Sequence, residues 1–287
     1  MIWILLILTA LPSVALMVFF YLKDKYEPEP RGHVVTAFLY GILVLIPALY
    51  AGGWISGLVS RDFLILGGVR ADLYRAFMIA ALTEEGFKYL LFLSTVARWR
   101  EFDEPFDGIV YGVAVSLGLA TVENMAYVFR VYATGGSPVM LAILRGVLAV
   151  PAHALYGAIM GYFVGRAKFM NAGKKKVLYY LSGFAAAWIF HGLYDFFCFY
   201  VGTLSGWMML IGVSVAMWVA VFWMMPQASV RSPFKDDGNT GNVEAGVATR
   251  KCDPDLIEKE RKTQDRENES GGIAVKRSAK RSSRDET

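Results

Sequence analysis

Long apolar stretches dominate the first 225 residues of the chain, and short polar segments separate them. Seven of these stretches approach or exceed the about 20 residues that an α-helix needs to cross the hydrocarbon core of a bilayer. They cover residues 2–22, 34–58, 74–96, 109–129, 141–164, 177–200 and 206–225. The pattern therefore predicts an all-α, polytopic integral membrane protein with about seven transmembrane helices.

The pattern changes sharply at Pro226. Residues 226–287 hold 13 of the 29 basic and 12 of the 25 acidic residues, and they contain neither Trp nor Tyr. A segment of this composition cannot bury enough apolar surface to fold, so we expect it to be disordered. The chain is accordingly divided into a transmembrane domain, residues 1–225, and a charged disordered cytoplasmic tail, residues 226–287.

Basic residues predict the orientation of the helices. The loops after the first, third and fifth stretches carry ten Lys and Arg residues, whereas the other side of the membrane carries four. Since basic loops stay in the cytoplasm, we expect a multi-pass protein of the cell membrane with its N-terminus outside and its tail inside. These loops also account for the net charge of +4 without a nucleic-acid partner.

A few ionisable residues interrupt the apolar stretches, and the most conspicuous are the adjacent Glu84 and Glu85. A charged side chain at the centre of a transmembrane helix costs about 2.5–3.5 kcal/mol on insertion scales, so such residues usually have a function. At about 1.5 Å of rise per residue, Glu84 lies about 15 Å from the outer end of its helix, His153 about 18 Å and His191 about 13 Å. Glu123 falls in the same layer. We expect this layer, near the midplane and toward the outer face, to be the functional site.

The spacings suggest how these side chains interact. Glu84 and Lys88 are four residues apart, so we expect Lys88 to partly neutralise Glu84. Glu85 points about 100° away, so both carboxylates are expected to border one cavity. His191 and Asp195 share the same four-residue spacing, which suits an imidazole oriented by a carboxylate.

Two further observations concern neighbouring polar residues. Asn124 follows Glu123 and is placed to supply a hydrogen bond, and Arg145 lies about two turns from His153. By contrast, Asp103 and Asp107 are expected only to cap a helix or face water.

Carboxylates beside neutral imidazoles are suited to activating water, and imidazoles with a carboxylate can hold a metal or polarise a carbonyl group. These residues also form four ordered sequence blocks. The blocks are Glu84-Glu85-Gly-Phe-Lys88, Phe106-Asp107-Gly108 leading to Glu123-Asn124, Arg145 with Pro151-Ala-His153, and His191-Gly-Leu-Tyr-Asp195. In this order they resemble the PrsW family of intramembrane proteases, which is related more distantly to the CAAX prenyl proteases.

The resemblance implies hydrolysis of a peptide bond in a membrane-bound substrate, such as the first cut in a single-span anti-sigma factor. It implies catalytic roles for Glu84, Glu85, His153 and His191, with one Glu as the base for water. It also implies that His153 and His191 bind a metal or stabilise the oxyanion, with Glu123 as a further ligand or orienting group and Asp195 in support. Zinc is the metal that this ligand set suggests.

Alternatives from other classes remain open at this point. Intramembrane Glu, Asp, His and Lys residues also form proton relays, so a proton- or cation-coupled transporter is the main alternative. A prenyl-protein protease would need a site that opens toward the cytoplasm. An immunity or scaffold protein would keep the residues without turnover.

Overall fold

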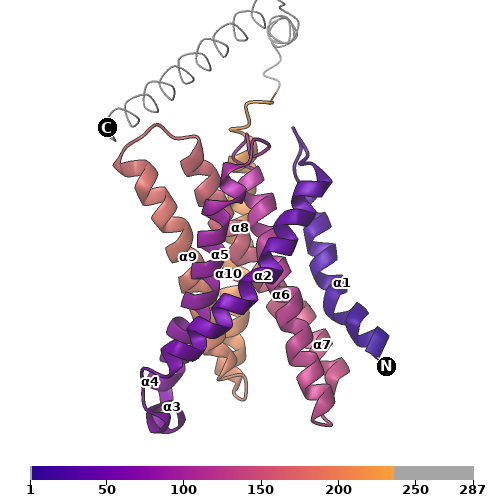
Figure 1. The fold of residues 1–287 in the computed structure, drawn as a ribbon, viewed down its shortest axis with the longest axis vertical. Helices are drawn as coiled ribbons and strands as arrows, with labels where there is room; N and C mark the ends of the chain where they lie inside the picture. Colours follow the sequence, from indigo (N-terminus) through magenta and orange to yellow (C-terminus); the bar gives the residue numbers. More distant parts are fainter. Residues whose placement is uncertain (1, 236–287) are drawn as a thin grey trace, which may run out of the picture. The chain divides into compact units, whose positions relative to one another are not determined.

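The computed structural model describes residues 2–235, and the described residues fold into a bundle of helices without strands (Figure 1). Most of the predicted tail, residues 236–287, lies outside the described residues. The elements are α1 (Ile2–Tyr21), α2 (Arg31–Ser56), α3 (Arg61–Leu66), α4 (Gly68–Leu73), the π-helix η1 (Tyr74–Ala81), α5 (Leu82–Ser94), the 3-10 helix η2 (Val96–Arg98), α6 (Asp107–Ala133), α7 (Pro138–Val147), α8 (Ala149–Lys168), α9 (Lys174–Cys198) and α10 (Leu204–Ser229).

All seven predicted stretches are helical, which confirms the fold class. Five segments of the described chain are long and apolar enough to cross a membrane: α1, α2, α6, the α7–α8 segment and α10. The other two predicted spans, η1–α5 and α9, carry more polar residues, including Glu84, Glu85 and Lys88 in the first. The final helix extends through Pro226 to Ser229, four residues beyond the predicted end of the apolar stretch.

Helices α6 and α8 form the centre of the bundle and pack closely through glycines. A Cβ atom added to Gly112 would lie 2.4 Å from the carbonyl oxygen of Gly157, and one added to Gly161 would lie 1.8 Å from the carbonyl oxygen of Gly108. Without side chains at these positions the two backbones approach one another directly, as is common between membrane helices. This contact fixes the position of α8, which carries His153.

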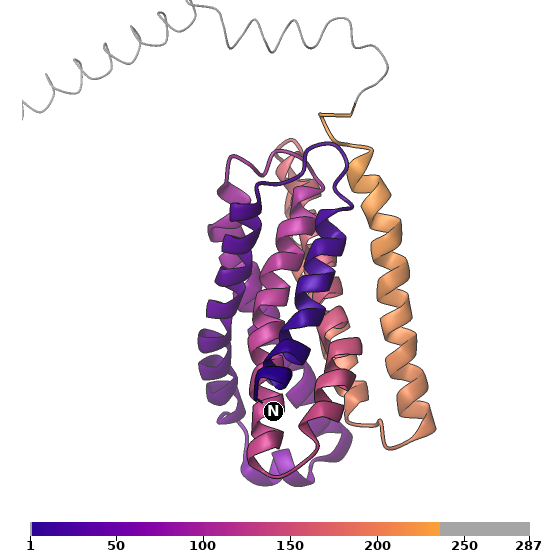
Figure 2. The same ribbon diagram turned by 90° about the vertical axis from the view of Figure 1, so that its right-hand side faces the viewer.

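The outer helices present apolar side chains to their surroundings. Leu43, Leu49 and Trp54 of α2 are exposed, as are Leu11 of α1 and Val219 of α10. Figure 2 shows α10 on one side of the bundle, with the α1–α2 connection and the C-terminal end of α10 at the same end. The short helices α3 and α4 lie at the opposite end (Figure 1). An exposed apolar surface of this extent is expected where lipid is the solvent.

Two local irregularities place the polar residues. The predicted fifth span is not one helix, because α7 ends at Val147 and α8 begins at Ala149. Pro151 explains the break, since it has no amide hydrogen and its ring would collide with the carbonyl group of residue 147, four positions earlier. The second irregularity is the π-helix η1, which ends just before α5 and Glu84. Short π-helical turns are frequent at functional sites.

Candidate active site

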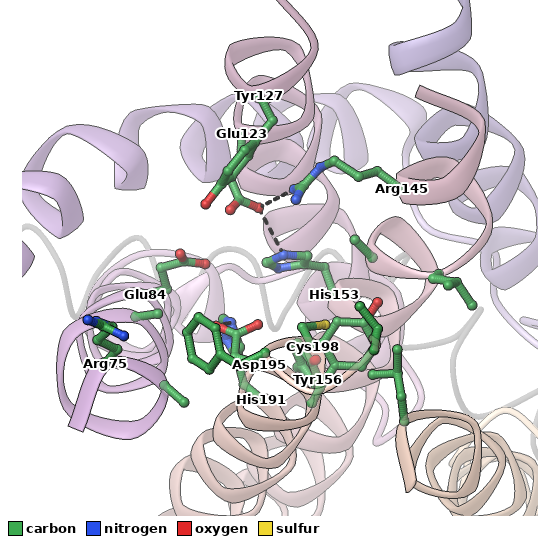
Figure 3. A pocket seen from close by; sticks show the side chains of 18 of the residues that line it. Arg75, Glu84, Glu123, Tyr127, Arg145, His153, Tyr156, His191, Asp195 and Cys198 are labelled. Atoms are coloured by element: carbon green, nitrogen blue, oxygen red, sulfur yellow. Dashed lines mark hydrogen bonds and ion pairs between the residues drawn. The ribbon is translucent and has the colours of Figure 1, made fainter. Parts of the chain in front are cut away.

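A cavity of about 550 Å³ lies among η1, α5 and helices α6–α10, and its polar lining includes six of the predicted residues: Glu84, Glu123, Arg145, His153, His191 and Asp195. Figure 3 shows these side chains, with Glu84 on one side and Glu123 and Arg145 on the other. Leu64 of α3 also lines the cavity, which therefore extends toward the end of the bundle that carries α3 and α4. The polar lining residues are Arg75, Glu84, Glu123, Tyr127, Arg145, His153, Tyr156, His191, Tyr194, Asp195 and Cys198.

A second cavity, of about 520 Å³, lies among α2, η1, α5 and α6. Glu84, Glu123 and Tyr127 line both cavities. The two carboxylates are thus accessible from two different sides of the η1–α5 segment.

Glu84 lies in the first turn of α5 and is the member of the glutamate pair that borders the cavities. Its Oε2 atom is buried and has no hydrogen-bond partner among the described residues. Glu84, His153 and His191 can each offer one ligand atom such that the three atoms lie within 4.8 Å of one another.

Glu85 takes a different position from the one expected. It is fully buried and does not line either cavity, and its Oε1 atom accepts a hydrogen bond of 2.5 Å from Lys88 Nζ. Lys88 therefore pairs with Glu85 rather than with Glu84, and it also donates to Ser116 Oγ at 3.3 Å. The expected contact between Lys88 and Glu84 is therefore absent among the described ion pairs, because the three-residue spacing brings the Glu85 carboxylate to the ammonium group instead.

His191 is held by carboxylates at both ring nitrogens. Its Nδ1 atom lies 2.7 Å from Glu85 Oε1, and its Nε2 atom lies 3.3 Å from Asp195 Oδ2, as the four-residue spacing predicted. The ring also stacks on Tyr156, with centroids 4.7 Å apart and an interplanar angle of 12°. The Glu85–Lys88 pair thus acts on the site through His191.

His153 is oriented from α6 and α7. Its Nε2 atom lies 3.2 Å from Glu123 Oε2, and the same oxygen accepts a hydrogen bond of 3.0 Å from Arg145 (Figure 3). Arg145 Nε also donates to Asn124 Oδ1 at 3.1 Å, and Asn124 in turn donates to the carbonyl oxygen of residue 9 in α1. If Nε2 carries the ring proton, Nδ1 of His153, which is buried without a partner, presents a lone pair.

Sequence reasoning missed three residues of the site: Tyr127, Tyr156 and Ser116. Tyr156 lies one turn after His153, stacks on His191 and keeps a buried hydroxyl group that has no partner among the described residues. Tyr127 packs under the Arg145 guanidinium at 4.2 Å. The spacing of three or four residues from His153 and Glu123 was an available signal for both tyrosines, whereas nothing local marks Ser116 as a partner of Lys88.

The group that fits a metal differs from the expected one by a single residue. It contains Glu84 with His153 and His191, whereas the Glu123 carboxylate is engaged by Arg145 and His153. The unpartnered Glu84 Oε2 and His153 Nδ1 atoms are of the types that zinc prefers. Carboxylates on the outer nitrogens of histidine ligands are also typical of metal sites.

Comparison with known proteins confirms the family resemblance. Residues 29–225 match the model of a family described as PrsW family intramembrane metalloprotease. A protein named Protease PrsW from Geobacillus kaustophilus (strain HTA426) is 41% identical over 184 residues, which cover 64% of this chain and 75% of the relative. The Protease PrsW of Bacillus subtilis (strain 168) is 35% identical over 68% of this chain and 82% of its own length. The Protease PrsW of Shouchella clausii (strain KSM-K16) is 34% identical over 78% of this chain and 97% of its own length. No solved structure gives a significant match.

Proposed function

Since the chain belongs to the PrsW family of intramembrane metalloproteases, and is thus a multi-pass membrane protease, we propose that its peptide-bond hydrolysis takes place at Glu84. The observation that carries this proposal is the convergence of Glu84, His153 and His191 on one cavity, with a Glu84 oxygen left unpartnered. A buried carboxylate oxygen without a partner is costly unless a ligand, water or metal occupies the site.

In the absence of a bound metal, Glu84 is proposed as the general base. A water molecule beside its carboxylate would transfer a proton to Glu84 while the oxygen attacks the carbonyl carbon of the substrate. The proton then passes to the nitrogen of the leaving amine as the peptide bond breaks. Between these steps negative charge develops on the carbonyl oxygen, and His191 or Arg145 is placed to stabilise it.

Glu85 is proposed as a positioning residue rather than as a second base. It lies behind His191 and shares its Oε1 atom between His191 Nδ1 and Lys88 Nζ. Glu123 has the corresponding role for His153, with Arg145 holding the carboxylate. His153 thus keeps Nδ1 without a partner among the described residues, whereas His191 has a carboxylate beside each nitrogen and would exchange Asp195 for a ligand at Nε2.

Zinc fits the same three residues, so we propose Glu84, His153 and His191 as its ligands, in place of the set with Glu123. When bound, zinc would polarise the substrate carbonyl and lower the pKa of water. Purified protein should then contain about one zinc per chain, and chelators should abolish cleavage. Purified protein that lacks stoichiometric zinc and cleaves equally well with chelators would rule out the metal. Glu84 would then act as a general base without zinc.

A single-span membrane protein of the anti-sigma-factor type is the substrate class that we propose. The family resemblance supports it, and so does the position of the cavity toward the α3–α4 end of the bundle. The distribution of basic residues between the loops supports an orientation with that end, and the N-terminus, outside the cytoplasm. Reporter fusions at Ser229 and in the α3–α4 segment test this orientation, since a cytoplasmic signal from α3–α4 would reverse it.

Co-expression with tagged single-span candidate substrates tests the catalytic assignment. We expect Glu84→Gln, His153→Ala and His191→Ala to lower cleavage at least about 100-fold at matched membrane levels. Glu101→Gln is the matched control, because Glu101 lies outside both cavities and pairs only with His33 among the described residues. Undiminished cleavage by Glu84→Gln would remove the assignment.

A further inference from the structure

A second cluster of carboxylates lies at the end of the bundle opposite α3 and α4. Asp24 and Glu29 come from the α1–α2 connection, Glu104 precedes α6, and Asp107 begins it. Their exposed fractions are 6%, 3%, 1% and 1%, so none of them faces water freely. The expectation that Asp107 merely caps a helix or faces water therefore does not describe it.

The cluster lacks partners for most of its oxygen atoms. Six carboxylate oxygens in it are buried without a hydrogen-bond partner among the described residues, including both oxygens of Asp24 and both of Glu104. Asp24, Glu104 and Asp107 can each offer an oxygen such that the three lie within 4.8 Å of one another. The unpartnered side chains of Asp24 and Glu104 are thus more than nine-tenths buried and directed into the cluster.

Nearby positive charges do not neutralise the cluster. None of the ion pairs within residues 2–235 includes Asp24, Glu29, Glu104 or Asp107. The ammonium group of Lys168 lies in the same region but donates to the carbonyl oxygens of Trp99 and Phe102. The partners that the cluster does have are the Tyr111 hydroxyl group on Glu29 and two backbone amides on Asp107.

We propose that Asp24, Glu104 and Asp107, with Glu29 beside them, bind a hard divalent cation such as Ca²⁺ or Mg²⁺. Both ions take oxygen ligands, and carboxylates are the oxygen donors that bind them most strongly in proteins. Around Ca²⁺, with Ca–O distances of about 2.4 Å, two opposite ligand oxygens lie about 4.8 Å apart. Histidine and cysteine are absent from the group, which separates this site chemically from the one at Glu84.

The cation would connect segments that are distant in the sequence. It would join the α1–α2 connection to the start of α6, the helix that carries Glu123 and Asn124 at its other end.

Thermal unfolding of the purified full-length protein in detergent tests the site. The protein is first stripped of metals with EDTA and then titrated with CaCl₂ or MgCl₂ at constant ionic strength. We expect the unfolding midpoint to rise with the logarithm of cation concentration, by about 5 °C at 100 times the dissociation constant. Asp24→Asn and Glu104→Gln should lose this response, whereas the control Glu101→Gln should keep it.

Comparing the metal-free variant with the metal-free wild-type protein distinguishes a loss of cation binding from a failure to fold. Because Asp24→Asn replaces a buried carboxyl group, whose ionised form burial and the neighbouring Glu104 disfavour, with a neutral amide, the stripped variant should unfold no earlier than the stripped wild-type protein. Equilibrium dialysis with ⁴⁵Ca in the Glu84→Gln background, which lacks one ligand of the other metal group, should give about one ion per chain. An unfolding midpoint that does not respond to either cation, or an equal response in Asp24→Asn, would overturn the proposal.

Discussion

Glu85 and Lys88 form a buried ion pair, and variants of this pair should distinguish its effect on stability from its effect on cleavage. Glu85→Gln leaves the Lys88 ammonium group buried without its counter-ion, and breaking a buried pair in this way costs about 3–5 kcal/mol. Glu85→Gln should therefore lower both the unfolding midpoint and the cleavage rate.

The double variant Glu85→Gln/Lys88→Met should recover stability, because no buried charge remains unpaired. It should still cleave about 10- to 100-fold more slowly than wild type, because His191 Nδ1 has lost its charged acceptor. Unfolding midpoints and cleavage rates of the three proteins, measured side by side, check this. Full cleavage by the double variant would show that Glu85 only balances the charge of Lys88.

At the residue scale the sequence predicted the His191–Asp195 pair, but it did not predict which glutamate pairs with Lys88. Apolar surroundings marked Glu84, His153 and His191 in advance, because few ionisable side chains occur in the spans. Helical spacing permits Lys88 to reach either glutamate, and the packing of α5 against α6, through Ser116, is what decides between them. The burial of Asp24 and Glu104 was not predictable either, since both lie in polar connections whose contacts are made by distant segments.

The close packing of helices α6 and α8 requires glycines at their contact, so replacing one of these glycines with alanine should destabilise the fold. A Cβ at Gly161 would lie 1.8 Å from the Gly108 carbonyl oxygen, so Gly161→Ala should separate the helices and destabilise the fold by about 1–3 kcal/mol. Gly212→Ala in α10 is the control, because nothing lies within 4 Å of its added Cβ. Thermal unfolding in detergent compares the two, and equal midpoints would contradict the proposed tight contact.

The helices themselves were largely predictable, because a long apolar run in a membrane must satisfy its backbone by forming a helix. The exceptions are local. Pro151 is a sequence signal for the break between α7 and α8, but the apolar run continues across it, so the pattern predicted one continuous helix. The π-helix η1 has no comparable mark in its sequence, Tyr74–Ala81, since its extra residue per turn is stabilised by packing against α9 and α2.

For the whole molecule, the buried acidic cluster predicts how stability depends on pH. Burial raises the pKa of Asp24 from 3.8 to about 9 and that of Glu29 from 4.5 to about 8. Between the unfolded and folded pKa values, the folded state binds more protons than the unfolded state. The free energy of unfolding should therefore fall as the pH rises from about 5 to about 9 in buffer without divalent cations.

Unfolding midpoints measured across this pH range check the prediction, with Asp24→Asn as the comparison. The variant should show a shallower decline, because it lacks one of the groups that release a proton on unfolding. Parallel curves for the two proteins would show that other groups set the pH dependence. Glu104 and Lys168 face the same cluster, and Glu104 interacts directly with Asp24, so part of the difference between the two curves comes from Glu104.

The presence of cavities on both sides of Glu84 constrains the conformation of whatever chain is cut there. In an α-helix each carbonyl group accepts a hydrogen bond from an amide four residues further on, and the backbone lies inside a cylinder of side chains about 10–12 Å wide. A peptide bond that is to lie beside the Glu84 carboxylate must therefore first become accessible, which it is not while side chains surround the helical backbone. A helical membrane segment, the substrate class proposed above, would therefore have to unfold about one turn, and the free energy of this local unfolding would depend on the substrate sequence. Two membrane segments with the same residues at the cut bond would then differ in rate according to how readily their flanking residues unwind.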